Sequence, residues 1–388
     1  MDRLRRVPDA GSHAAGLPAH RRPDAVRGER HHLSLLRAAS DGAGGTALLS
    51  PLMRFGIFDQ LEQPGGVPWH ELYRHRLDLL VRAEKAGVWG WHKSEHHLIP
   101  LDAAPSINVF LAAAIERTSR IRICSLVHLL PFYHPIRLAE ELCMLDQLSE
   151  GRLEFGFGKG ISVPEHLLWG LDPDDAIAQT DESLELILAA MQTSGNFSFD
   201  GQFYEFRDVP IEFEPYQKPY PPLWRPGQLE TAAEMGVRTM AAGPLAAVAA
   251  STARYRELLC AAGIGRHHSP MIGGLRRLVV APTDEEADEI GRRTWAAFTE
   301  HLTRLFMRYE MTPPNDPTLG GDYDKAKHFQ AVVVGSPQTV REHCEQFAAE
   351  AGTDYFVGVF AWGDLSAYEV DRSFDLFAEH VMAPLAAL

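Results

Sequence analysis

The hydrophobic positions of the chain alternate between short continuous apolar runs and longer segments with helical spacing, from residue 54 to the carboxyl end. Short β-branched runs without polar alternation are typical of parallel strands that are buried on both faces. Strands are predicted at residues 54–59, 88–91, 121–127, 153–157, 222–224, 238–242, 275–280 and 355–360. Strands that alternate with helices in this way, without internal repeats, predict an α/β fold, a (β/α)8 barrel.

Amphipathic segments separate the predicted strands. The clearest one starts at Pro135, because proline suits the first turn of a helix, where its missing N–H has no partner to lose. Ile136, Ala139 and Leu142 then recur at helical spacing, and Gly151 supplies the left-handed stop. Helices are predicted on this basis at residues 69–85, 107–117, 135–148, 181–192, 229–235, 244–262, 283–309, 366–381 and from 336 onward.

Two segments interrupt the alternation, one after the fourth predicted strand and one after the seventh. Residues 196–220 are rich in aromatic and acidic side chains and predict a loop or small hairpin lying over the barrel. Residues 312–327 are rich in Pro, Gly and Asp, and a long loop of this composition is often an active-site lid.

The first 52 residues differ from the rest. They contain many arginines, no lysine and no steady apolar period. A transit peptide is one interpretation, but acidic residues such as Asp2 and Asp9 argue against it. We favour a disordered extension translated from a start codon upstream of the true one, because Met53 directly precedes the first strand. The barrel is therefore assigned to residues 53–388.

Composition narrows the classes of partner. A length of 388 residues suits one elaborated barrel, and the formal net charge of −15 argues against nucleic acid, which requires clustered basic residues. The sequence contains no apolar run of about 18 residues, so no membrane span is expected. The cysteines lie far apart without a CxxC pair, which favours reduced thiols in a cytoplasmic protein.

The first candidate for chemistry is the polar segment that follows the second strand. Its sequence His92-x-x-Glu95-His96 matches the inverted zinc-peptidase motif. That motif requires a helix, so that both histidines share one face. The segment instead follows a strand and stops at Pro100, so a zinc hydrolase is a weak alternative. Glu95, His96 and His97 can instead line the barrel mouth, where an imidazole can transfer a proton near pH 7. The interpretation that these residues form a purely structural polar cluster is also left open.

The second candidate is the glycine loop Gly156-Phe157-Gly158-Lys159-Gly160, which follows the fourth strand. It lacks the spacing of the dinucleotide fingerprint. A phosphate cradle with one cationic side chain is one interpretation, and a plain turn with an exposed lysine is the other.

Taken as an ordered set, several motifs resemble those of the bacterial luciferase-like flavin monooxygenase family. The resemblance covers residues 53–388 and rests on segments 94–97, 130–137, 145–153, 156–160, 334–337 and 375–384. It implies a luciferase-like barrel that reacts reduced FMN with O₂ and oxygenates a small apolar organic substrate, by aldehyde or ketone oxidation or by hydroxylation. It also implies a separate NAD(P)H:flavin reductase and a homodimer.

The resemblance assigns roles to individual residues. His96 matches the family's proton-handling histidine, flanked by Glu95 and His97. Lys159 matches the basic residue that holds the flavin phosphate, usually an arginine, with Gly158, Gly160 and Ile161 around it. Leu126 and Val127 match the strand end where the family carries a non-proline cis peptide against the flavin ring.

One departure from the family lies at residues 224–228, where the loop after the fifth strand is shorter by a few residues. Arg225 and Gln228 are the residues expected to compensate at the flavin phosphate. Two further alternatives follow. One is an oxidoreductase on the same barrel that uses the deazaflavin F420, and the other is a flavin-binding protein without catalysis.

Overall fold

The computed structural model describes residues 53–265, 270–313, 321–353 and 355–386. The predicted extension at residues 1–52 lies outside the described residues, and so do residues 314–320 of the predicted lid. None of the described helices is both long enough and apolar enough to cross a membrane.

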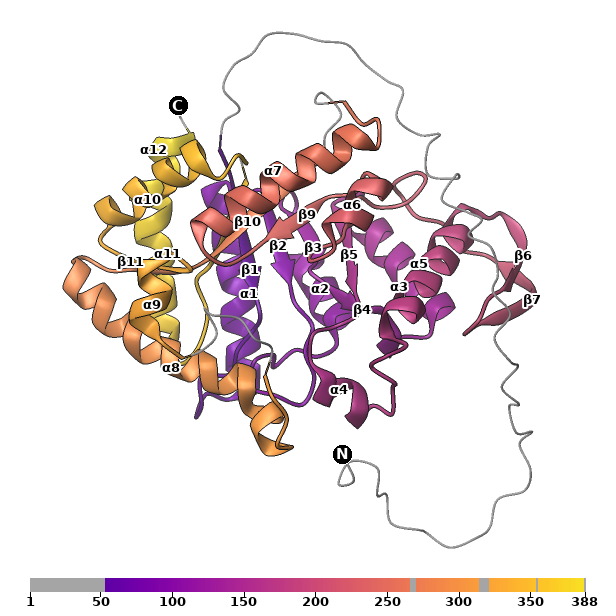
Figure 1. Ribbon diagram of the computed structural model, residues 1–388, viewed down its shortest axis with the longest axis horizontal. Coiled ribbons are helices and arrows are strands. Elements are labelled where there is room, and N and C mark those ends of the chain that lie inside the picture. Colours follow the sequence, from indigo (N-terminus) through magenta and orange to yellow (C-terminus); the bar gives the residue numbers. More distant parts are fainter. Residues whose placement is uncertain (1–52, 266–269, 314–320, 354, 387–388) are drawn as a thin grey trace, which may run out of the picture. The chain divides into compact units, whose positions relative to one another are not determined.

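Parallel strands lie at the centre of the described part of the chain (Figure 1), and their pairing forms a ring. The strands of the ring are β1 (Arg54–Asp59), β2 (Gly90–Lys93), β3 (Arg122–Ser125), β5 (Leu153–Gly158), β8 (Leu223–Trp224), β9 (Thr239–Ala241), β10 (Ile272–Val280) and β12 (Tyr355–Val359). Neighbours pair in the order β9-β10-β12-β1-β2-β3-β5-β8. A parallel bridge between Trp224 and Arg238 links β8 to the residue before β9, so the predicted (β/α)8 barrel is confirmed.

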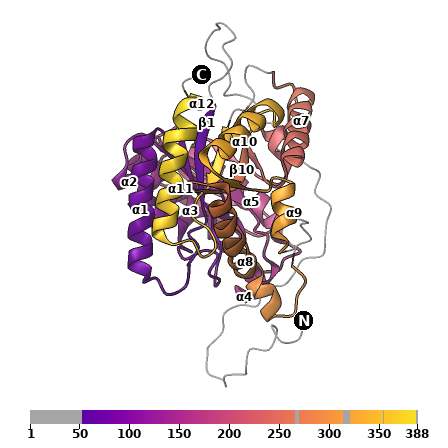
Figure 2. The ribbon, with the colours of Figure 1, turned by 90° about the vertical axis from the view of Figure 1, so that its left-hand side faces the viewer.

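Helices cover the outside of the ring (Figures 1 and 2). They are α1 (Trp69–Ala86), α2 (Ile107–Arg117), α3 (Pro135–Leu148), α5 (Ala176–Gln192), α6 (Leu229–Met235), α7 (Leu245–Ala261), α8 (Asp284–Arg308), α10 (Pro337–Glu350) and α11 (Ala367–Phe377). In α1, Leu72, Leu79 and Leu80 are buried, and Gly87 ends the helix at φ 92° with its N–H bonded to the last turn. The apolar spacing read from the sequence therefore marks the inward faces.

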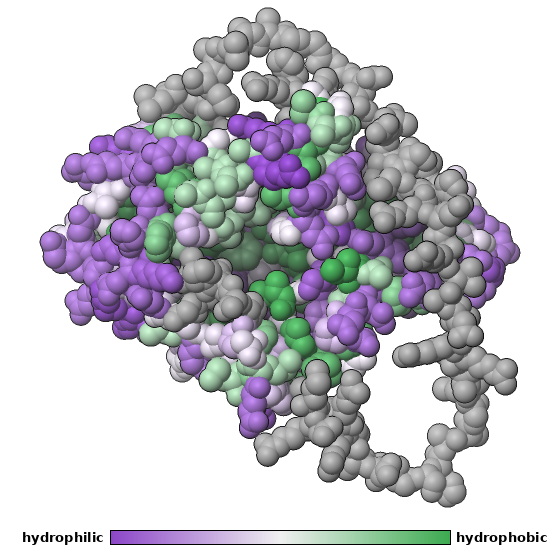
Figure 3. Space-filling view, viewed as in Figure 1, coloured by the Kyte–Doolittle hydropathy of each residue, from purple (hydrophilic) through white to green (hydrophobic). Residues whose placement is uncertain are grey.

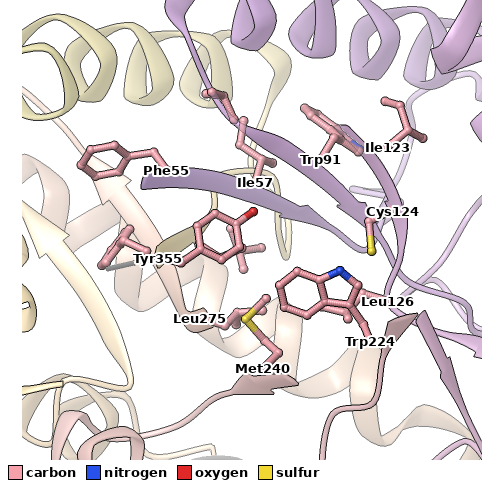
Figure 4. Close-up of a cluster of buried hydrophobic side chains, with 14 of the residues drawn as sticks. Phe55, Ile57, Trp91, Ile123, Cys124, Leu126, Trp224, Met240, Leu275 and Tyr355 are labelled. Carbon is pink, nitrogen blue, oxygen red and sulfur yellow. The ribbon is translucent and has the colours of Figure 1, made fainter. Parts of the chain in front are cut away.

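Side chains fill the interior of the barrel (Figure 4). Trp224, Leu275, Met240 and Tyr355 meet there. A Cβ on Gly56 of β1 would lie 2.1 Å from the Tyr355 hydroxyl, so the interior leaves room only for glycine at this position. A filled interior confines ligands to the two ends of the barrel.

The first insertion forms the antiparallel hairpin β6 (Gly195–Asp200) and β7 (Glu205–Ile211). The prediction of a hairpin is confirmed, but its predicted place over the barrel is wrong. Figure 1 shows the hairpin beside α5, away from the ring. The reason is Glu182 of α5, whose carboxylate accepts hydrogen bonds from the backbone N–H groups of the hairpin turn at residues 202–204.

Several short elements were not predicted. They are β4 (His128–Leu129), α4 (Val163–Leu168), α9 (Tyr323–His328), β11 (Val332–Gly335) and α12 (Ala383–Ala386). Helix α9 occupies the end of the predicted lid, which is therefore not entirely a loop, because Asp322 caps it by accepting from Lys325 N. The buried valine run of β11 pairs with β10 and carried a strand signal in the sequence.

Candidate active site at the carboxyl ends of the strands

A cavity of about 320 Å³ opens at the carboxyl ends of β1, β2, β3, β5 and β8. Every residue predicted to hold the cofactor lines it, from Leu126 to Gln228, together with Glu95 and His96. His97 does not line it. On the side of the molecule seen in Figure 3, apolar side chains gather near the middle.

A buried ion pair anchors the segment after β2. Lys93 Nζ donates to Asp102 Oδ2 at 2.6 Å and to the carbonyl oxygen of Ser94 at 2.7 Å, and neither side chain of the pair is exposed. Burial raises the pKa of Asp102 to about 6, although Lys93 acts in the opposite direction. The pair fixes the backbone that leads into Glu95 and His96.

Glu95 is fully engaged with neighbouring donors. Its Oε1 accepts from the Tyr133 hydroxyl at 2.8 Å and lies 3.0 Å from His97 Nε2, while Oε2 accepts from Leu129 N at 3.0 Å. Burial and the Glu95 carboxylate raise the pKa of Tyr133, so this hydroxyl stays a donor. These contacts make Glu95 a residue that positions the segment, rather than a free base.

The ring of His97 points away from the cavity and into an aromatic group. It stacks on Phe132 with a centroid distance of 5.2 Å and an interplanar angle of 8°, and it meets the edge of Trp169. Its backbone N–H donates to Glu165 Oε2 at 3.1 Å. The structure therefore gives the predicted catalytic residue His97 a packing position.

His96 faces the cavity and is paired with a carboxylate that was not predicted. Its Nδ1 lies 3.1 Å from Glu165 Oε1, and 14% of the side chain is exposed. Burial opposes the charged imidazolium, but the hydrogen bond and charge of Glu165 outweigh it and raise the pKa of His96. Because Nδ1–H donates to Glu165, Nε2 is the nitrogen left for chemistry.

Glu165 comes from the first turn of α4, where Ser162 caps the helix by accepting from Glu165 N. Ser162-x-x-Glu165 is a helix-start pattern, so the sequence carried a signal for the helix. It carried none for the pairing, since Glu165 lies 69 residues from His96.

The wall between β3 and β5 contains the predicted cis peptide bond between Leu126 and Val127. Here the two strands approach closely, because a Cβ on Gly156 would lie 2.0 Å from the carbonyl oxygen of Ser125. The Ser125 hydroxyl donates to Gly156 O and accepts from Gly156 N, each at 2.9 Å. The wall beside the cavity is therefore fixed and apolar.

The glycine loop continues this wall. Lys159 Nζ lies 3.3 Å from the carbonyl oxygen of Gly160, which has a φ of +83°. His166 of α4 contacts the backbone of the loop. Its Nε2 lies 2.7 Å from Lys159 O, and its Nδ1 lies 2.9 Å from Ser162 O. Lys159 pairs with no carboxylate among the described residues, so its charge is available to a ligand.

Arg225 also lines the cavity and is 4% exposed. Its Nη2 donates to Asp181 Oδ1 at 2.6 Å and to Gln228 Oε1 at 2.5 Å. Its Nε donates to the same Gln228 oxygen at 3.1 Å. The guanidinium also lies 5.2 Å from the Phe157 ring centroid. Arg225 and Gln228 are thus hydrogen-bonded to each other at the cavity, and Asp181, which was not predicted, offsets part of the arginine's charge.

The cavity suits a flat apolar ring that carries an anionic group, because an apolar wall adjoins one free and one partly neutralised cation. A metal fits less well. Within the described ranges, no group of three His, Cys, Asp or Glu side chains could hold one. His92 points into the barrel interior, with Nε2 2.5 Å from the Tyr355 hydroxyl. The residues of the zinc-peptidase motif therefore do not come together in one site.

Comparison with known proteins gives a family and close relatives. Residues 53–355 match the family model of luciferase-like monooxygenases. The uncharacterized protein y4wF of Sinorhizobium fredii is 34% identical over 327 residues, which are 82% of this chain and 93% of that protein. The alkanal monooxygenase alpha chain of Photobacterium leiognathi is 26% identical over 351 residues, 82% of this chain and 95% of its own length. The oxygenase component of the flavin-dependent trigonelline monooxygenase of Acinetobacter baylyi is 29% identical over 175 residues, 44% of this chain and 48% of that protein.

Solved structures share the fold. Monooxygenase RslO1 of Streptomyces bottropensis superposes with a TM-score of 0.74 at 26% identity, over 86% of this chain and 99% of that chain. The oxygenating constituent of 3,6-diketocamphane monooxygenase of Pseudomonas putida, in complex with FMN, gives 0.70 at 20% identity, over 86% and 98%. The F420-dependent tetrahydromethanopterin reductase of Methanopyrus kandleri gives 0.63 at 16% identity, over 86% and 99%.

Proposed function

The chain belongs to the luciferase-like monooxygenase family, and from this premise we propose that it is an FMN-dependent monooxygenase acting on a small apolar organic substrate. The observation that carries the proposal is the single cavity in which the expected flavin residues meet His96. When bound, reduced FMN supplies the electrons with which O₂ is activated. The chain supplies binding, orientation and proton handling.

The lining fits the two ends of FMN. Leu126 and Val127 offer a flat apolar wall for the ring system, at the cis peptide bond. Lys159 and the glycine loop, with Arg225 and Gln228 opposite, would hold the phosphate. A lysine in place of the family's usual arginine keeps the charge but not the bidentate fork, so the grip on the phosphate is expected to be weaker.

The rest of the lining favours an apolar substrate. Phe58, Leu129, Phe157, Ile161 and Ile177 contribute side chains, and a wall of this kind also excludes water from the reacting face. One relative is named an alkanal monooxygenase, and one structural neighbour is a Baeyer–Villiger monooxygenase. These names support an aldehyde, a ketone or an activated carbon as the group that is oxygenated.

His96 is the proposed proton-handling residue. Glu165 raises its pKa and occupies Nδ1, which favours the protonated imidazole and leaves Nε2 to pass the proton. A residue in this role typically contributes about 10² to 10⁴ to the rate.

Two partners accompany this function. A separate NAD(P)H:flavin reductase is supported by the relative named as an oxygenase component. A homodimer is supported by exposed apolar side chains on α2 and α3, namely Val109, Met144 and Leu148. The cytoplasmic location and the start of the barrel at Met53 stay predictions.

The test begins with anaerobic titration of the full chain with reduced FMN and with reduced F420, followed by oxygen uptake with a panel of aldehydes and ketones. We expect binding of reduced FMN and substrate-dependent oxygen uptake. His96→Ala is expected to abolish turnover while reduced FMN still binds, and His70→Ala, at a side chain 71% exposed on α1, is the matched control. Unchanged turnover in His96→Ala would exclude the proposed role.

The titration also separates the alternatives. Binding of reduced F420 with hydride transfer and no oxygen uptake would assign the chain to the deazaflavin enzymes, a possibility favoured by the F420-dependent structural neighbour. Tight flavin binding without turnover on any substrate would indicate a flavin-binding protein without catalysis.

A further inference from the structure

A second cavity, of about 360 Å³, lies among the amino ends of the barrel strands. Arg54 at the start of β1, Arg238 just before β9 and Arg256 of α7 line it, with Thr353 before β12 and an apolar floor that includes Leu259 and Met271. Arg54, the first residue of β1, lines this cavity, and Phe58 of the same strand lines the active-site cavity. At about 3.3 Å per residue, roughly 13 Å of strand separates the two, so the flavin phosphate cannot serve both.

The arginines of this cavity carry an excess of positive charge. Among the described residues no carboxylate lines the cavity. Arg238 donates to Glu154, but Arg122 and the Trp224 indole donate to the same carboxylate. In the part of the chain that the structure describes, Arg54 and Arg256 form no ion pair, although the protein as a whole carries a net charge of −15.

All three arginines line one cavity, and two of them contact the same indole. The Cζ atoms of Arg54 and Arg238 lie 6.0 and 5.7 Å from the centroid of the same Trp89 ring. Arg256 Nη1 lies 3.5 Å from the position of a Cβ built on Gly352, the residue before Thr353. Cation–π contact with one indole orients two of the groups without neutralising either.

The other polar side chains of the cavity are already occupied. The Tyr255 hydroxyl donates to Val237 O, and the Thr353 hydroxyl donates to Ile272 O. The guanidinium groups are therefore the donors that remain, and guanidinium matches the planar geometry of oxyanions, with two parallel hydrogen bonds per group.

We propose that this amino-terminal cavity is a binding site for a compact multivalent oxyanion, such as the phosphoryl or pyrophosphoryl group of a small molecule. Guanidinium groups that line one cavity repel one another, and a bound multivalent anion offsets that repulsion. The volume admits the oxyanion together with a small organic part that packs on Leu259 and Met271. The site is independent of the flavin cavity and of the proposed function.

The test is calorimetric titration of the full chain with pyrophosphate at constant ionic strength. We expect saturable binding that weakens about tenfold for each arginine removed, hence about 100-fold in the double variant Arg54→Ala/Arg256→Ala. Both residues are exposed, so the variant should fold, which far-ultraviolet circular dichroism checks. Arg254→Ala is the matched control, because Arg254 lies on the same helix but pairs with Glu230 and Glu257.

A second control locates the binding. Lys159→Ala, in the active-site cavity, should leave unchanged the pyrophosphate affinity of the site that contains Arg54 and Arg256. The proposal is overturned if the wild-type chain does not bind pyrophosphate, if the double variant binds it as tightly as the wild type, or if Lys159→Ala abolishes the binding.

Discussion

Two regions of the molecule, the barrel interior and the barrel mouth, each hold a histidine from the same short segment. His92 lies in the interior, where its ring meets the edge of Trp224 at 5.2 Å and burial lowers its pKa to about 4. Only four positions later in the chain, His96 lies at the mouth, and Glu165 raises its pKa. One turn from strand to loop thus separates a histidine whose pKa is lowered from one whose pKa is raised.

The difference arises from how a nearby carboxylate is shared. In the interior, Glu154 accepts hydrogen bonds from Arg122, Arg238 and Trp224, so little of its charge is left to favour a protonated His92. At the mouth, Glu165 accepts from His96 and from one backbone N–H, and no described cation pairs with it. Burial alone does not decide the charge of a histidine, because the competition for its carboxylate partner also counts.

The largest effect is expected from removing the shared carboxylate of the interior. Glu154→Ala removes the carboxylate that two guanidinium groups and an indole N–H share, and it should lower the free energy of unfolding by about 3–5 kcal/mol. Urea unfolding followed by tryptophan fluorescence measures the change. Glu185→Ala, at an exposed position of α5, is the control and should stay within about 0.5 kcal/mol of wild type. Equal stability of the two variants would contradict the role given to Glu154.

The barrel and the position of the cavity could be predicted from the sequence, for identifiable reasons. Parallel strands are continuous apolar runs, their carboxyl ends are directly followed by polar or glycine-rich segments, and the (β/α)8 topology brings those ends together. The segments after β2 and β5, around His96 and Lys159, therefore meet in one cavity as expected.

The partners of the site residues could not be predicted in the same way. Glu165 pairs with His96 across 69 positions, and Asp181 pairs with Arg225 across 44, so both contacts depend on tertiary structure that no local pattern encodes. The cis peptide bond at Leu126 was expected only from the family resemblance. The hairpin was placed wrongly, because its anchoring acceptor, Glu182, lies on another element.

An intermediate effect is expected from acid, with opposite signs for the two histidines. As the pH falls from about 6.5 to about 4, the unfolded chain protonates His92 but the folded chain does not, so stability falls by about 3 kcal/mol. His128 and His343, with pKa values lowered by burial to about 3 and about 4, add to the loss. His96 contributes stability below about pH 6.5 that disappears as the pH rises through its raised pKa.

The variant His92→Gln isolates the interior contribution, because glutamine can bond to Tyr355 but does not titrate. Its free energy of unfolding should fall less steeply than that of the wild type between pH 6.5 and pH 4. The two slopes should differ by about 1.4 kcal/mol per pH unit, which is the contribution of one proton. An identical slope in wild type and His92→Gln would mean that His92 binds its proton equally well in both states.

The smallest effect is expected at the mouth, from Glu165→Gln. Without the carboxylate charge the pKa of His96 should fall, so fewer molecules hold the proton at pH 7.5 and turnover should drop about tenfold. Because the deficit lies in proton occupancy, lowering the pH should restore part of the turnover, and the dissociation constant for reduced FMN should not change. A variant damaged only in structure would lose activity equally at every pH. The pH profile of the turnover rate, followed as O₂ consumption, therefore distinguishes a carboxylate that sets the charge of His96 from one that merely holds α4 in place.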